Sequence, residues 1–197
     1  MQTLSAQFHK PTGVMGQVVG WVLAAENRDR NTWAVSLLDV QSHHRILEIG
    51  FGPGLAIEVA ARKAVVGMVA GIDHSEVMVK QASRRNSAAI REGRVNLRLG
   101  DPALIPFENG FFNSVLTVNA FHMWENQAKG LSEVLRVLKP DGKIVIVEQP
   151  VSGDLEAQAE AVRIELPAKL AQAGFRSAQV ENITLKRKPV VAAIGLK

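Results

Sequence analysis

The 197-residue sequence contains no cysteine and no tyrosine, and aromatic residues make up only 5% of it. The absence of cysteine excludes disulfide bonds, thiolate catalysis and cysteine-based metal sites. No set of histidines and carboxylates shows metal-ligand spacing either, so we expect no bound metal. Hydrophobic residues make up 47% and charged residues 21%, which is typical of one globular domain with a sizeable core.

The sequence also lacks an apolar run of the roughly 20 residues that a membrane-spanning helix needs. The best candidate, residues 13–25, is interrupted by Gly16, Gln17 and Gly20, and a single basic residue, Lys10, precedes it. We interpret this stretch as an amphipathic helix of the folded domain rather than a secretion signal. We therefore expect a cytoplasmic protein without a membrane partner.

Excess charge of one sign is small, because the net charge is only +4. The densest basic stretch contains one acid, Glu92, among Arg84, Arg85, Arg91, Arg94 and Arg98. A nucleic-acid surface usually combines a denser basic face with interleaved aromatic residues. We interpret these arginines as solvated surface, which argues against DNA and disfavours RNA as partners. The sequence does not predict an oligomeric state.

Short apolar runs bounded by glycine, aspartate or proline predict buried strands. The three clearest runs cover residues 45–49, 68–72 and 143–147, and weaker candidates cover 95–99, 114–118, 178–185 and 190–196. Helical patterns lie between them, at residues 53–65, 75–91, 125–138 and 155–173. Strands that alternate with helices predict a parallel sheet with helices on both faces.

Details of these elements give further expectations. Ser75 is a candidate N-cap for a single helix over 75–91. Lys139-Pro140-Asp141-Gly142 is a turn signal after the helix 125–138, and Pro167 divides 155–173 into two helical pieces. The last two strands have no helix between them, so they should pair as a hairpin, with a tight connection at Lys188-Pro189 and one strand antiparallel to the rest.

The most informative segment is Leu47-Glu48-Ile49-Gly50-Phe51-Gly52-Pro53-Gly54, where the first buried strand meets a helix. Glycines allow a sharp turn and a close approach of the backbone to a ligand. A dinucleotide site would need a small residue at the sixth position, which is Leu55, and a phosphate loop would need Gly-Lys-Ser/Thr. The acid before the glycines suits a ligand with a cationic ammonium and no pyrophosphate.

Two further acids follow the next strands. Asp73 ends the second strand, where an acid can bind both hydroxyls of a ribose, and Asp101 follows the third, where it can accept from an adenine amino group. Each acid alone is more often a strand-end cap. Together with Glu48 they form a row at one edge of the predicted sheet, which favours a nucleoside ligand.

The sequence resembles the class I S-adenosylmethionine-dependent methyltransferases, and among them the methyltransferase type 11 group. The resemblance covers residues 44–197 and rests on the segments 46–54, 71–75 with Met78, 100–101 with 105–107, 112–115, 133–142 and 173–175. It implies a Rossmann-like sheet of seven strands in the order 3-2-1-4-5-7-6, with strand 7 antiparallel. We expect a single domain over 1–197, in which residues 1–43 form an N-terminal helical cap on the core, 44–197.

The resemblance also implies a site for S-adenosyl-L-methionine (SAM). The residues expected to contact this cofactor are Glu48, Gly50, Phe51, Gly52, Gly54, Asp73, His74, Asp101, Pro102 and Asn119. Asn119 would bind the amino-acid end of the cofactor, and His74 would border its adenine.

The end of the fourth strand faces the methyl group in this architecture. There His122 is a candidate general base, because imidazole titrates near neutral pH, although it could equally well only pack in the wall. Glu148, at the end of the fifth strand, is a second candidate, either as a base or as a polar contact to the substrate. The segment Asn119-Ala120-Phe121-His122 differs from the Asp/Asn-Pro-Pro-Tyr/Phe of amino-directed DNA methyltransferases.

The short segment after the fifth strand leaves no room for an inserted lid domain. We therefore expect methyl transfer to a small-molecule substrate whose acceptor atom the sequence does not specify. Two alternatives stay open: an RNA or protein methyltransferase that uses the 84–98 stretch, and a cofactor-binding module without catalysis.

Overall fold

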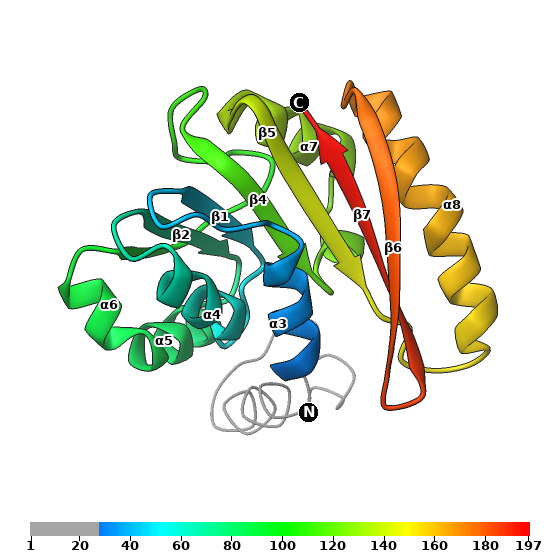
Figure 1. Ribbon diagram of the computed structural model, residues 1–197, viewed down its shortest axis with the longest axis horizontal. Coiled ribbons are helices and arrows are strands. Elements are labelled where there is room, and N and C mark those ends of the chain that lie inside the picture. The colour runs from blue at the N-terminus through cyan, green and yellow to red at the C-terminus, as the bar shows by residue number, and fades with distance from the viewer. Residues whose placement is uncertain (1–27) are drawn as a thin grey trace.

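The computed structural model describes residues 28–197, which form a seven-stranded sheet between two layers of helices (Figure 1). The strand order is β3-β2-β1-β4-β5-β7-β6. The strands are β1 (Arg45–Ile49), β2 (Met68–Asp73), β3 (Val95–Leu99), β4 (Phe112–Val118), β5 (Leu138–Glu148), β6 (Ser177–Leu185) and β7 (Lys188–Leu196). All neighbouring pairs from β3 to β5 are parallel, whereas β7 runs antiparallel to both β5 and β6. This topology confirms the Rossmann-like fold.

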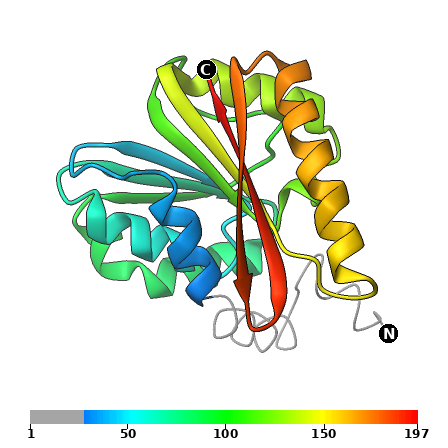
Figure 2. The same ribbon diagram turned by 45° about the vertical axis from the view of Figure 1, so that its right-hand side comes forward.

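Helices cover both faces of the sheet (Figures 1 and 2). One apolar core lies under α3 (Arg28–Ser36), α4 (Leu55–Lys63), α5 (Glu76–Arg85) and α6 (Ser87–Arg91). The other lies under the 3-10 turn η1 (Phe121–Met123), α7 (Gln127–Val137) and α8 (Leu155–Ala173). Alternate residues of β1 feed the two cores: Ile46 belongs to the first, and Leu47 and Ile49 to the second. Strands that are apolar on both faces need helices on both sides, which explains the continuous apolar runs.

The prediction of one helix over 75–91 is wrong, because the helix is interrupted at Asn86. This residue is buried, and its side-chain amide donates to the backbone oxygens of Gly54 and Ala82. Its bond to Gly54 ties the end of α5 to the glycine loop, and α6 begins directly afterwards. An asparagine side chain that binds backbone groups competes with the regular helix, which accounts for the break. The predicted N-cap is confirmed, since Ser75 Oγ accepts from the Met78 N–H at 3.4 Å.

The prediction that Pro167 divides 155–173 is also wrong, because α8 is one helix with this proline inside it. An interior proline costs about 3 kcal/mol, since it removes a hydrogen bond and clashes with the preceding turn. Buried side chains lie on both sides of it, with Ala159 and Leu166 before and Leu170 after. Their packing against the sheet keeps the helix continuous despite this cost.

The structure differs from the prediction at two connections. Residues 139–142 do not form a separate turn, because β5 begins at Leu138 and includes them. The irregularity appears instead as a register shift against β4 and as a left-handed Asp141, with φ of 60°. The β6–β7 hairpin turns at Lys186 and Arg187, with φ of 48° and 65°, and not at Lys188-Pro189, which already pairs within the ladder.

The proposed helix over residues 13–25 lies outside the described residues. Of the N-terminal segment, α3 is described, and its Ala34 and Val35 are fully buried in the first core. Within residues 28–197, no helix has both the length and the apolar character that crossing a membrane requires.

Candidate functional site

The glycine loop between β1 and α4 has a left-handed backbone at three positions, with φ of 73° at Gly50, 52° at Gly52 and 79° at Gly54. The three glycines have different surroundings. A Cβ atom at Gly50 or Gly54 would lie 2.4 Å from Ala120 Cβ or 2.6 Å from Ala82 Cβ, respectively. At Gly52 it would meet no atom within 4 Å. The outer glycines therefore allow close packing, while Gly52 faces open space that a ligand could occupy.

Asp73, at the end of β2, is bound to this loop. Its Oδ2 accepts from the Gly52 N–H at 2.8 Å, and its Oδ1 accepts from the Ser75 N–H at 2.9 Å. The side chain is 5% exposed, and burial raises its pKa, although these two N–H groups act in the opposite direction. Each carboxylate oxygen accepts more than one hydrogen bond, so Asp73 keeps acceptor capacity for a ligand hydroxyl.

Glu48, at the end of β1, is the second buried acid. It is 3% exposed, and its Oε2 has no hydrogen-bond partner within the described part of the chain. Burial and the neighbouring charge of Asp73 raise its pKa well above the usual value. A buried carboxylate oxygen without a donor is costly, and a ligand that brings a cation or an N–H group would remove that cost.

The acid after β3 lies in a different environment. Asp101 is exposed, and its Oδ1 accepts from the Ala103 N–H at 2.8 Å, which holds a turn that includes Pro102. His74 is also exposed, and its Nδ1 lies 3.9 Å from Asp73 Oδ1. Because β3, β2 and β1 are adjacent and parallel, the three acids do lie at one edge of the sheet. The Phe51 side chain is buried in the first core, which leaves only its backbone for a ligand.

Asn119 follows β4 with a left-handed backbone, φ 50°. Its Oδ1 accepts from the Gln149 N–H at 2.8 Å, and its own N–H donates to Val147 O at 2.8 Å. These bonds join the ends of β4 and β5 and orient the side-chain amide. Its NH2 group then lies at the opposite end from the occupied oxygen, where it can donate to a carboxylate.

The two candidate catalytic residues are in direct contact. His122, in η1, places Nδ1 2.9 Å from Oε2 of Glu148, and its backbone N–H donates to Glu148 Oε1 at 3.3 Å. Glu148 ends β5 and is buried, whereas the imidazole is 57% exposed. The hydrogen bond to Glu148 raises the pKa of His122. A carboxylate on Nδ1 favours the tautomer with its proton there, which leaves Nε2 as the basic atom.

Arg30, in the first turn of α3, is a residue that the sequence did not single out. It is 6% exposed, and its Nη1 donates to Gln149 Oε1 at 2.7 Å. Burial lowers its pKa to about 10, while the nearby charge of Glu148 acts to raise it, so it remains a cation at neutral pH. Figure 1 shows α3 in front of the sheet near the ends of β4 and β5. No motif marks Arg30, and only the fold brings it to these strands.

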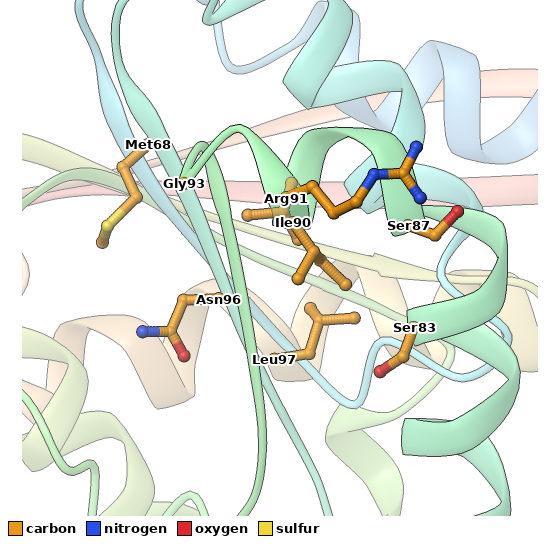
Figure 3. A pocket seen from close by; sticks show the side chains of 9 residues that line it. Met68, Ser83, Ser87, Ile90, Arg91, Gly93, Asn96 and Leu97 are labelled. Atoms are coloured by element: carbon orange, nitrogen blue, oxygen red, sulfur yellow. The ribbon is translucent and has the colours of Figure 1, made fainter.

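A surface hollow of about 540 Å³ lies apart from these residues, between α5, α6 and the starts of β2 and β3 (Figure 3). Its lining includes Ser83, Ile90, Arg91 and Met68, and none of the predicted site residues. Parallel sheets of this class bind ligands at the carboxyl ends of their strands, so this hollow is not the candidate site. Among residues 28–197, no three His, Asp or Glu side chains form a group that could hold a metal ion.

Comparison with known sequences identifies the family of the chain. The model of the methyltransferase domain family matches residues 47–146. The uncharacterized methyltransferase YdaC of Bacillus subtilis is 31% identical over 181 residues, which are 91% of this chain and 98% of that protein. A ubiquinone/menaquinone biosynthesis C-methyltransferase, UbiE of Geotalea daltonii, is 29% identical over 81% of this chain and 82% of its own length.

Solved structures show the same fold. A SAM-dependent methyltransferase from Aquifex aeolicus superposes with a TM-score of 0.69 at 20% identity, over 88% of this chain and 91% of that one. A phosphoethanolamine N-methyltransferase from Haemonchus contortus, solved with phosphomonomethylethanolamine and S-adenosylhomocysteine, gives a TM-score of 0.68 at 18% identity, over 86% of this chain and 52% of the other. With its motifs, topology and relatives in agreement, the chain belongs to the methyltransferase domain family and is a class I SAM-dependent methyltransferase of type 11.

Proposed function

We propose that the protein transfers the methyl group of SAM to a small-molecule acceptor, with His122 as the general base. The observation that carries this proposal is the 2.9 Å contact between His122 and Glu148. It lies at the ends of β4 and β5, beside the strands that carry Asp73 and Glu48. One edge of the sheet thus holds a nucleoside-type site next to an oriented imidazole.

The residues at this edge fit SAM. Asp73 has acceptor capacity for ribose hydroxyls, and Gly52 leaves room beside it. Glu48 Oε2, which no group within residues 28–197 hydrogen-bonds, suits the ammonium group of the methionine part, and Asn119 offers an amide to its carboxylate. Asp101 and His74 lie on the β3 side, where we place the adenine. When bound, SAM supplies an electrophilic methyl group on a positively charged sulfur.

The residues of the chain would then orient the acceptor and remove its proton. Transfer is a direct displacement, so the nucleophile, the methyl carbon and the sulfur must lie in line. Glu148 holds Nδ1–H of His122, and Nε2 accepts the proton of a hydroxyl, amine or acidic C–H acceptor as the new bond to carbon forms. The imidazolium that results is stabilised by the adjacent carboxylate.

Two observations support a small acceptor over RNA. Three of the five arginines of the 84–98 stretch are used within the fold: Arg85 donates to Pro53 O, Arg94 to Ala61 O and Arg98 to Pro106 O. In addition, UbiE is named for a small-molecule pathway, and the Haemonchus enzyme is named for its phosphoethanolamine acceptor.

The test is to incubate the protein with methyl-labelled SAM and a whole extract of bacterial cells, which is then separated into small-molecule, RNA and protein fractions. We expect a labelled low-molecular-weight product that depends on His122. Label that appears only in RNA or protein fractions would contradict the proposal, as would product formation that is unchanged in His122→Ala.

A further inference from the structure

The guanidinium of Arg30 is buried, and the other side chains of residues 28–197 satisfy only part of its hydrogen-bonding capacity. Among residues 28–197, only its Nη1 has a hydrogen-bond partner, Gln149 Oε1, and its buried Nε has none. A buried N–H donor of a cation that binds nothing carries the full cost of its lost hydration. A ligand that supplies the missing acceptor would remove this cost.

Glu148, the acid whose charge acts on Arg30, does not serve as that acceptor. Glu148 faces Arg30 closely enough to raise its pKa, yet both of its carboxylate oxygens bind His122, one at Nδ1 and one at the backbone N–H. The Arg30 guanidinium therefore lies beside Glu148 without a hydrogen bond to it among the described residues. With a protonated His122, the three side chains together carry one net positive charge.

The Nε side of the guanidinium can bind an anion through two nitrogens. Nε–H and the adjacent Nη2 point in parallel and bind the two oxygens of a carboxylate or phosphate in a bidentate manner. Gln149 occupies the opposite nitrogen, Nη1, and so orients this edge. Gln149 is itself held by Asn119, which places the group next to the ends of β4 and β5.

We propose that the Nε edge of Arg30 binds an oxygen anion, a carboxylate or a phosphate, at the methyl-transfer end of the site. This inference rests on the proposed function. Two molecules could present the anion there: an acidic methyl acceptor, or the cofactor through its methionine carboxylate. In either case the anion would bind beside His122 and Glu148, which already bind each other.

The experiment compares the wild type with Arg30→Lys, which keeps the charge and loses the Nε edge. Arg28→Gln is the matched control, because Arg28 is an exposed cation on the same helix. Calorimetry measures the binding of S-adenosylhomocysteine and of its decarboxylated analogue. It then measures acetate and inorganic phosphate binding to protein saturated with S-adenosylhomocysteine. The ¹⁵Nε resonance of Arg30 in the wild type reports anion binding independently of any variant's folding.

A preference of at least tenfold for the carboxylate-bearing product, lost in Arg30→Lys and kept in Arg28→Gln, would assign the anion to the cofactor. Equal binding of both products, with acetate or phosphate binding that shifts the Arg30 resonance and weakens at least tenfold in Arg30→Lys, would assign it to the acceptor. The inference would be overturned if Arg30→Lys kept the full preference for the carboxylate-bearing product, or if neither product were preferred, with no anion binding and no shift of the Arg30 resonance in either case. If the wild type bound neither product, the proposed function would fail instead, and anion titration of the unliganded protein would still test Arg30.

Discussion

Nδ1 of His122 lies 2.9 Å from Oε2 of Glu148, although the two residues are 26 positions apart in the sequence. The contact joins the turn after β4 to the end of β5 and fixes which imidazole nitrogen is free. It joins two separately plausible candidates into one unit, in which the proposed function makes Glu148 the positioning residue and His122 the base. Several measurements distinguish this arrangement from simple packing.

Replacing His122 with alanine should lower turnover by about 10²–10⁴-fold, the usual contribution of a general base. Cofactor affinity should stay within a few-fold, because the three acids assigned to the cofactor lie at the ends of β1, β2 and β3. Steady-state kinetics on the labelled product and calorimetry with S-adenosylhomocysteine would measure the two effects. A variant that loses thermal stability but keeps its turnover per folded molecule would show that His122 only packs.

Replacing Glu148 with glutamine should move the acid limb of the pH–rate profile to lower pH. The hydrogen bond that His122 donates to the Glu148 carboxylate raises the pKa of His122, and the base must be neutral to accept a proton. In the wild type, activity should therefore rise with pH through a value above the ordinary 6.5. The variant should reach its plateau at a lower pH, with a smaller maximum rate. An acid limb that does not move would separate Glu148 from the titrating group.

Replacing Glu48 with glutamine should stabilise the unliganded protein near neutral pH and weaken SAM binding. A raised pKa means that Glu48 contributes stability below its ordinary value of 4.5, and that this contribution is lost as pH rises through the raised value. The neutral amide avoids that loss, so the difference in melting temperature should shrink on acidification.

In Glu48→Gln, the affinity for S-adenosylhomocysteine should fall by about 10- to 100-fold, the value of one charge-assisted hydrogen bond. Glu125→Gln, at an exposed position, is the control and should change neither property. Equal melting curves for Glu48→Gln and the wild type across the pH range would contradict the buried-acid interpretation.

Two alanine substitutions in the glycine loop should have different effects. Gly54→Ala adds a methyl group 2.6 Å from Ala82 Cβ at a left-handed position and should destabilise the fold by about 2–4 kcal/mol. Gly52→Ala adds it to open space, so it should cost only about 1–2 kcal/mol of backbone strain and mainly weaken cofactor binding. Denaturant unfolding and calorimetry on both variants would test this, and equal stability losses with equal affinities would refute it.

The sheet and the acids at its edge could be predicted from sequence, because buried parallel strands are short apolar runs and the glycine motif follows the first of them. The break at Asn86 could not, since it depends on a bond to Gly54, 32 residues earlier. Pro167 carried a local helix-breaking signal that packing on the sheet outweighs. Arg30 had no local signal at all, because its hydrogen-bond partner, Gln149, lies 119 residues later in the sequence.

The central claim is that Asp73 and its neighbours bind SAM, and calorimetry with S-adenosylhomocysteine tests it most directly. The wild type should bind with a micromolar dissociation constant, about −8 kcal/mol. Asp73→Asn removes the charge and one acceptor oxygen and should weaken binding at least tenfold, about 1.4 kcal/mol. Asp141→Asn, at an exposed position, should bind like the wild type. An unsaturable titration of the folded wild type, or the same dissociation constant in Asp73→Asn, would contradict the account.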